Sequence, residues 1–141
     1  MSVSMSPAER EAFLAQVHVG VLAVAGGQDR GPLVTPVWYT YQPGGLVSVS
    51  TGASSNKARA IAAAGRFSLC AQDEAPPYRY VTVEGPAVTG PASLAERTEL
   101  ARRYLGRDGG DAFIAANPGA DEVMIRMTPE HWRTADFGKA G

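Results

Sequence analysis

The segment LVSVSTGASSNKARAIAAAGRFSLCAQ, residues 46–72, decides the fold because it joins two predicted strands through one short helix. Residues 46–51 and 66–72 are β-branched or alternate apolar and polar side chains, which is typical of strands. Between them, Ser54 and Ser55 precede an alanine-rich stretch that is predicted to be helical. Lys57 and Arg59 lie on the first turns of this helix, so hydroxyls and cations gather where it begins.

Two interpretations of this helix start are open. A helix N-terminus presents unpaired N–H groups and a partial positive charge, and it therefore binds anions readily. Ser54 and Ser55 could donate hydroxyl groups to a phosphate, and Lys57 and Arg59 would add charge at close range. The alternative is a surface helix that Ser54 or Ser55 merely caps, with both cations in solvent.

The remainder of the chain predicts antiparallel strands with helices at the periphery. Further strands are expected at residues 17–25, 32–41, 78–89 and 121–128, with a short one in the tail. Helices are expected at residues 6–16, 93–105 and 111–117, the first and second opening with capping boxes. The pattern predicts one domain over residues 1–141, mainly β, built as a small antiparallel β-barrel decorated by helices.

Three local features refine this arrangement. Short turns join the first three strands, which predicts an antiparallel meander. Pro36 lies inside the second strand and would remove a ladder donor, so it indicates an edge, a bulge or backbone that faces a ligand. Gly85 and Pro86 predict a kink in the long strand at 78–89.

Composition excludes several classes of function. The chain has 141 residues, a formal net charge of -1 and 19% charged residues, without the basic surplus of a non-specific nucleic-acid binder. No apolar run reaches the ~18 residues of a membrane span, and the first residues do not resemble an export signal. We therefore expect a cytoplasmic protein without nucleic-acid or membrane partners.

Catalytic side chains are not indicated by any motif. The histidines are His18 and His131 and the cysteine is Cys70, so no metal-ligand pattern and no intrachain disulfide is expected. Nucleophile elbows and P-loops are also missing from the sequence. We expect any chemistry to be carried by a bound cofactor, and no catalytic residue is predicted.

Two more stretches carry candidate binding residues. In VTPVWYTY, residues 34–41, an aromatic pair after Pro36 could present backbone groups to a flat heterocycle, or Trp38 and Tyr39 could be ordinary strand residues. In YRYVTVEG, residues 78–85, Arg79 could reach an anion or a partner subunit, or stack on its neighbours in solvent.

Taken in order, TPVWYTY, VSVSTGASSNKARAI and YRYVTVEGPA resemble the pyridoxamine-phosphate-oxidase-like superfamily, and most closely its flavin/deazaflavin oxidoreductases of the B type. The resemblance covers roughly residues 10–135 and extends to the late segment PEHWRTADFGK. It implies a split β-barrel of the FMN-binding type that forms a homodimer, with two cofactor sites at the subunit interface.

The resemblance also implies which residues bind the cofactor. The region around Trp38 lines the ring through its backbone, the end of the third strand and the helix start hold the phosphate and ribityl chain, and Arg79 lies near the site. The implied binding residues are Thr35, Pro36, Val37, Trp38, Ser50, Thr51, Ser54, Ser55, Lys57, Arg59 and Arg79.

The expected function is hydride transfer between a deazaflavin coenzyme of the F-420 type and a small organic acceptor, with FMN as the alternative cofactor. Other hypotheses are a protein that binds or sequesters the cofactor without turnover, and a barrel that has lost its cofactor. Vitamin B6 oxidation is not expected, because pyridoxamine-phosphate oxidases hold the substrate phosphate with Arg-x-His and residues 130–133 here read EHWR.

Overall fold

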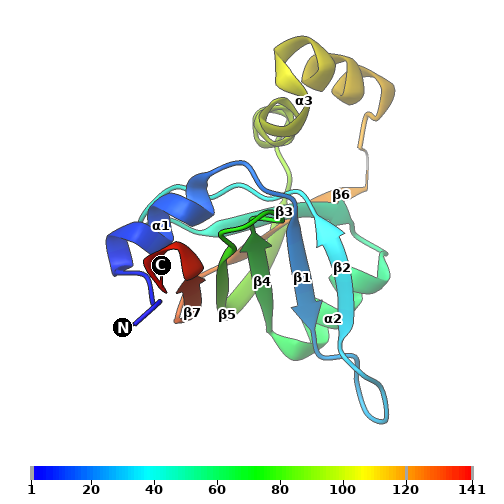
Figure 1. Ribbon diagram of the computed structural model, residues 1–141. Helices are drawn as coiled ribbons and strands as arrows, with labels where there is room; N and C mark the ends of the chain where they lie inside the picture. Colours follow the sequence, from blue (N-terminus) through cyan, green and yellow to red (C-terminus); the bar gives the residue numbers. More distant parts are fainter. Residues whose placement is uncertain (1, 120, 141) are drawn as a thin grey trace.

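A curled antiparallel sheet forms the body of the molecule, and three helices lie around it (Figure 1). The computed structural model describes residues 2–119 and 121–140. Within them the strands are β1 (Gly20–Val24), β2 (Leu33–Val37), β3 (Val47–Gly52), β4 (Arg66–Gln72), β5 (Arg79–Pro91), β6 (Glu122–Met127) and β7 (His131–Asp136). The helices are α1 (Pro7–Ala15), α2 (Asn56–Ala64), α3 (Leu94–Ala116) and the 3-10 turn η1 (Phe137–Ala140).

Strand β5 connects the two halves of the sheet. The strand order is β2-β1-β4-β5-β6-β3, and β7 also pairs with β5. The first part of β5 pairs with β7, and from Ala87 onward it pairs with β6. Between these parts lies Gly85, where a Cβ would come within 1.7 Å of the carbonyl oxygen of Thr128. The kink expected at Gly85 and Pro86 thus coincides with the point where β5 changes its partner.

The barrel is split between β2 and β3, which lie at opposite ends of the strand order. Beyond the end of β2, an isolated antiparallel bridge joins Thr40 to Ser48 of β3. The predicted meander is therefore wrong after its first hairpin, because β3 pairs with β6 and not with β2. Just after β2 the chain leaves the sheet, and there the N–H of Tyr39 donates to the Tyr104 hydroxyl at 3.0 Å instead of to a neighbouring strand.

The core fills the inside of the curled sheet. Alternate residues of the strands point inward, and Leu22, Leu69 and Val83 are fully buried. Ile61 of α2 and Leu14 of α1 are also fully buried and belong to the same core. Since alternation sends the intervening residues outward, burial in β1, β3 and β4 follows the period of two that the sequence shows.

Helix α3 stands away from the barrel and is divided by Gly106, whose φ of 78° is not helical (Figure 1). The two helices expected at 93–105 and 111–117 correspond to its two halves. Arg103 anchors the first half by donating to the carbonyls of Ala15 and Gln16, at 3.2 and 2.6 Å. The hydroxyl of Tyr104 donates to the carbonyl of His18 at 2.6 Å. Among the described residues, no helix has the length and apolar character needed to cross a membrane.

Candidate functional site

A cavity of about 500 Å³ lies at the split in the barrel, beneath α3. One side is formed by Pro36, Val37 and Trp38, at the end of β2. The facing side is formed by Ser50 of β3, Lys57 of α2 and Glu122 of β6, and the roof comes from α3 and the residues after it. The cavity therefore exists because β2 and β3 diverge, and its volume is in the range of small-molecule sites.

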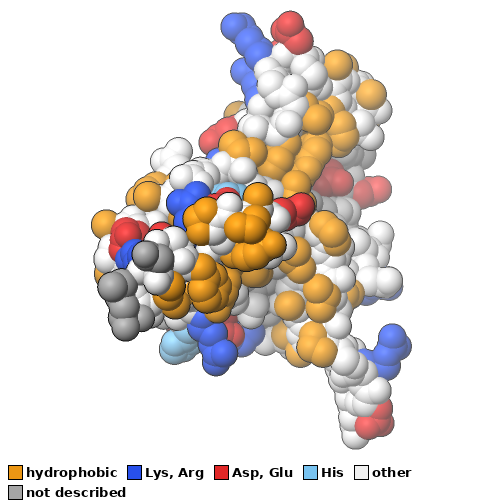
Figure 2. All heavy atoms as spheres, viewed as in Figure 1, with side chains coloured by type: hydrophobic (Ala, Val, Ile, Leu, Met, Phe, Trp, Pro, Cys, Tyr) orange, Lys and Arg blue, Asp and Glu red, His pale blue; other side chains and the backbone are white. Residues whose placement is uncertain are grey.

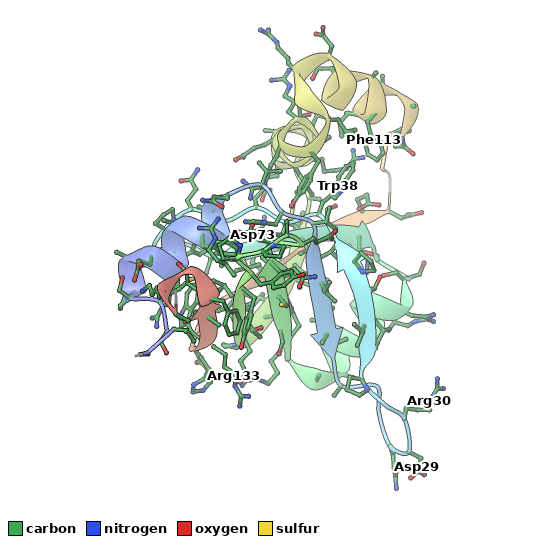
Figure 3. The ribbon with its side chains drawn as sticks, viewed as in Figure 1. Asp29, Arg30, Trp38, Asp73, Phe113 and Arg133 are labelled. Atoms are coloured by element: carbon green, nitrogen blue, oxygen red, sulfur yellow. The ribbon has the colours of Figure 1, made fainter. Side chains whose placement is uncertain are left out.

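Aromatic side chains form one wall of this cavity. The Trp38 ring is stacked on Tyr104, with centroids 5.1 Å apart and an angle of 8° between the planes. Phe113, on the second half of α3, lies 5.4 Å from Trp38 in a tilted arrangement. In Figure 3, the side chains of Trp38 and Phe113 lie between α3 and the barrel. Trp38 and Phe113 line the cavity itself and give it an apolar, aromatic wall of the kind that packs against planar rings.

The polar corner of the cavity combines both signs of charge. The Ser50 hydroxyl donates to Oε2 of Glu122 at 2.7 Å. Lys57 forms no ion pair or hydrogen bond within residues 2–119 and 121–140, although it lines the same cavity. An ammonium group without a protein partner beside a cavity is available to an anionic ligand.

The first turn of α2 differs from those of the other two helices. Helices α1 and α3 begin with capping boxes and place Glu9 and Glu96 in their first turns, where a carboxylate balances the helix dipole. Helix α2 has Ser55 as its cap and no acidic residue in its first turn, and Lys57 is its second residue. A cation at a helix N-terminus is electrostatically unfavourable, so this helix start gains most from an external anion.

Five of the eleven residues predicted to bind a cofactor line the cavity, namely Pro36, Val37, Trp38, Ser50 and Lys57. Thr51 and Ser55 lie next to it in a capping arrangement. Their hydroxyl oxygens are 3.0 Å apart, and Ser55 accepts from the N–H of Ala58. Ser55 thus caps α2, and Lys57 lines the cavity, while the phosphate site at this helix start stays a prediction.

The other predicted residues lie outside the cavity lining. Thr35 and Ser54 do not contribute to it. Arg59 is exposed, and its Nη2 donates to Oδ1 of Asn56 at 3.0 Å. Arg79 pairs with Asp73 at 2.7 Å and lines a different, more open hollow. Their part in cofactor binding therefore stays a prediction.

Ten lining residues were not predicted from the sequence, among them Arg97, Phe113 and Glu122. Arg97 and Phe113 belong to α3, and nothing in a helical pattern shows which part of the barrel that helix will cover. Glu122 opposes Gly52 in the β3–β6 register, a pairing across some seventy residues without a local signal. No cluster of potential metal ligands occurs among the residues that the structure describes.

The divided antiparallel barrel, with a cavity at its opening, defines a split-barrel protein. The chain belongs to the pyridoxamine 5'-phosphate oxidase family, whose model matches residues 6–136. The expected superfamily and split-barrel fold are therefore confirmed.

Solved structures support the same assignment. The conserved hypothetical protein Rv2991 from Mycobacterium tuberculosis is 25% identical, with a TM-score of 0.79 over 99% of this chain and 90% of that chain. A protein described as an F420 reductase is also 25% identical, with a TM-score of 0.70 over 87% of this chain and 94% of that one.

More distant structures share the fold alone. A FAD-binding protein from Mesorhizobium loti is 19% identical, with a TM-score of 0.66 over 93% of this chain and 94% of that one. The comparison with curated proteins gave no match.

Proposed function

We propose that the cavity binds a flavin-type cofactor, a deazaflavin of the F-420 type in preference to FMN, and that the protein is an oxidoreductase acting on a small organic acceptor. The observation that carries this proposal is the start of α2, where Lys57 without a protein partner faces a cavity walled by Trp38. Support for the deazaflavin comes from the likeness to the F420 reductase at 25% identity.

The residues present fit such a cofactor. Its phosphate would be held by Lys57 and the N-terminal end of α2. An anion there balances both the ammonium group and the partial positive charge of the helix end. The ring would lie against Trp38 and Phe113, and ribityl hydroxyls would donate to the Glu122 carboxylate, which already accepts from Ser50. One cavity thus offers an apolar wall for the ring, the Glu122 carboxylate as a hydrogen-bond acceptor and the Lys57 ammonium as a cation.

A bound deazaflavin or flavin would supply hydride transfer to or from an organic acceptor. The chain's own contribution is orientation and exclusion of water. The stacked pair of Trp38 and Tyr104 would fix the wall against which the ring packs, because the Tyr104 hydroxyl is held in turn by the backbone carbonyls of His18 and Tyr39. No step requires a catalytic side chain from this protein.

The proposal is tested by reoxidation of reduced cofactor. Reduced F-420 and reduced FMN are each mixed with the protein and a panel of enones, quinones and tetrapyrroles under exclusion of oxygen, and cofactor absorbance is followed. Enzyme-dependent reoxidation by at least one acceptor is expected. Binding without reoxidation by any acceptor would indicate a cofactor carrier, and absence of binding to either cofactor would contradict the proposal.

A further inference from the structure

Arg97 of α3 is a buried cation without a carboxylate partner. Its exposure is 8%, and no ion pair of Arg97 exists among residues 2–119 and 121–140. Arg126 and Arg102, by contrast, pair with Glu96 and Asp111, and both are far more exposed. Burying a charge costs free energy unless it is compensated, so an arginine in this position calls for a reason.

The guanidinium of Arg97 is fixed in place by backbone. It donates to the carbonyl of Pro118 through Nη1 at 2.9 Å and to that of Asn117 through Nη2 at 2.6 Å. These two bonds use two of the five N–H donors of an arginine, and the carbonyls solvate the charge without neutralising it. The remaining donors have no protein partner within the described residues.

Gly119 provides the space for this guanidinium. Its φ is +70°, and a Cβ at this position would lie 2.2 Å from Cζ of Arg97 and 2.4 Å from Nη2. The left-handed backbone and the missing side chain together let the arginine head lie against residues 117–119. The segment after α3 is thus shaped around the position of this charge.

Arg97 and Lys57 line the same cavity from opposite elements, α3 and α2. The third charged lining residue is Glu122, so these three side chains leave one positive charge in excess. A cavity with two cations that lack carboxylate partners has the electrostatics of an anion site, and a guanidinium fork matches the oxygens of phosphate or carboxylate.

We infer that Arg97, positioned by Asn117, Pro118 and Gly119, is a second anion-binding group of this cavity and binds a phosphate or carboxylate of the ligand together with Lys57. This inference rests on the proposed function for the identity of the ligand, but not for the anion site itself. The phosphate of FMN and the phosphate or glutamate carboxylates of F-420 share the chemistry that this site recognises.

The test compares ligands that differ in their anionic groups. Affinities are measured for FMN and riboflavin, and for F-420 and its chromophore without phosphate and glutamates, in wild type, Arg97→Met and Gly119→Ala. Arg107→Met is the matched control, since Arg107 is exposed on the same helix. Pyrophosphate alone is titrated by thermal shift, which requires no chromophore.

Arg97→Met should weaken the binding of FMN or F-420, whichever the wild type binds, by about ten- to a hundredfold. It should leave unchanged the affinity for the counterpart without those anionic groups, riboflavin or the bare F-420 chromophore. Gly119→Ala should act in the same direction, because its methyl group displaces the guanidinium without removing charge. Arg107→Met should change neither. Arg97→Lys, which retains the charge, replaces Arg97→Met if that variant does not fold.

The outcomes separate the two proposals. If no chromophore binds but pyrophosphate raises the Tm of wild type and not of the Arg97 variant, the anion site stands and the cofactor proposal fails. If FMN or F-420 binds and its preference over the neutral partner is the same in the Arg97 variant, the inference about Arg97 is overturned and the cofactor proposal stands. No response of wild type to pyrophosphate or to any chromophore would overturn both.

Discussion

At the scale of single residues, Lys57 connects the sequence to the site most directly. It could be selected from the sequence because a cation at a capped helix start is unusual, and the resemblance points to the same position. Trp38 and Ser50 could also be selected from the sequence. Trp38 follows a proline inside a predicted strand, and Ser50 lies at the end of another. Arg97 could not be selected, because its significance lies in its burial against residues 117–119, which no local pattern reveals.

Replacing Lys57 by Ala should weaken cofactor binding by ~1–3 kcal/mol, the usual effect of losing a charge-assisted contact. Isothermal titration of wild type and variant measures the difference. Arg30→Ala is the control for loss of charge alone, since Arg30 lies at the tip of an exposed loop away from Trp38 (Figure 3). Arg59→Ala should have a smaller effect than Lys57→Ala, because Arg59 is directed to Asn56. Equal affinity of wild type and the Lys57 variant would place the phosphate elsewhere.

Glu9 should make stability depend on acid pH. Its hydrogen bond with Lys139, and then its bond with the backbone of Ser6, lower the pKa of this carboxyl from 4.5 to about 2. A lowered folded-state pKa contributes stability that is complete above about pH 4.5 and lost as the pH falls towards about 2. Because Lys139 belongs to η1 and Glu9 to α1, the same ion pair also connects these two elements.

Urea unfolding of wild type and Glu9→Gln between pH 2 and pH 7 measures this contribution. The two free energies of unfolding should differ near neutral pH and converge as the pH falls through the stated window. A difference that is independent of pH would show that the loss comes from the helix cap and not from the charge of Glu9.

At the scale of elements, local patterns predicted strands and helices well, and long-range pairing poorly. Strand β4 has the bounds expected from its alternation, and the capping boxes at Ser6 and Ser93 begin α1 and α3 as expected. The place of β3 beside β6 was missed, because short turns favour hairpins and the sequence does not show that Tyr39 will leave the sheet. Since the cavity opens at that departure, its existence could not be deduced from the strand pattern.

Tyr104→Phe should loosen α3 from the barrel. The Tyr104 hydroxyl accepts from the N–H of Tyr39 and donates to backbone carbonyls, so its removal leaves a partly buried donor unsatisfied, at a cost of about 1–3 kcal/mol. The phenyl ring retains the stack on Trp38. Denaturant unfolding measures the loss, and Tyr78→Phe, at an exposed position, is the control. An equal free energy of unfolding for wild type and Tyr104→Phe would contradict this account of how α3 is held.

At the scale of the whole molecule, an apolar sheet face lies uncovered beside the site. Val34 of β2 and Val19 before β1 are 61% and 56% exposed, and Tyr80 of β5 is also exposed. Figure 2 shows hydrophobic side chains gathered over the sheet formed by β1, β2 and β4. Pro36 lies on the same face of β2 as Val34 and lines both the cavity and the neighbouring hollow. A partner on this face would therefore also border the cavity.

We propose that a second copy of the chain covers this face and that the protein is a homodimer. Burial of exposed valines and tyrosines supplies the driving force for such an association. Val34→Lys should shift the protein towards monomer at micromolar concentration, measured by light scattering, whereas Val88→Lys on the other half of β5 should not. A wild-type protein that is monomeric under these conditions would contradict the proposal.

The central claim is that the cavity at the split of the barrel holds a flavin-type cofactor. Titration of the purified protein with F-420 and with FMN, followed by cofactor absorbance and fluorescence, tests it most directly. The account predicts saturable binding in the micromolar range or tighter, with F-420 favoured over FMN. Absence of micromolar binding to both cofactors would contradict it.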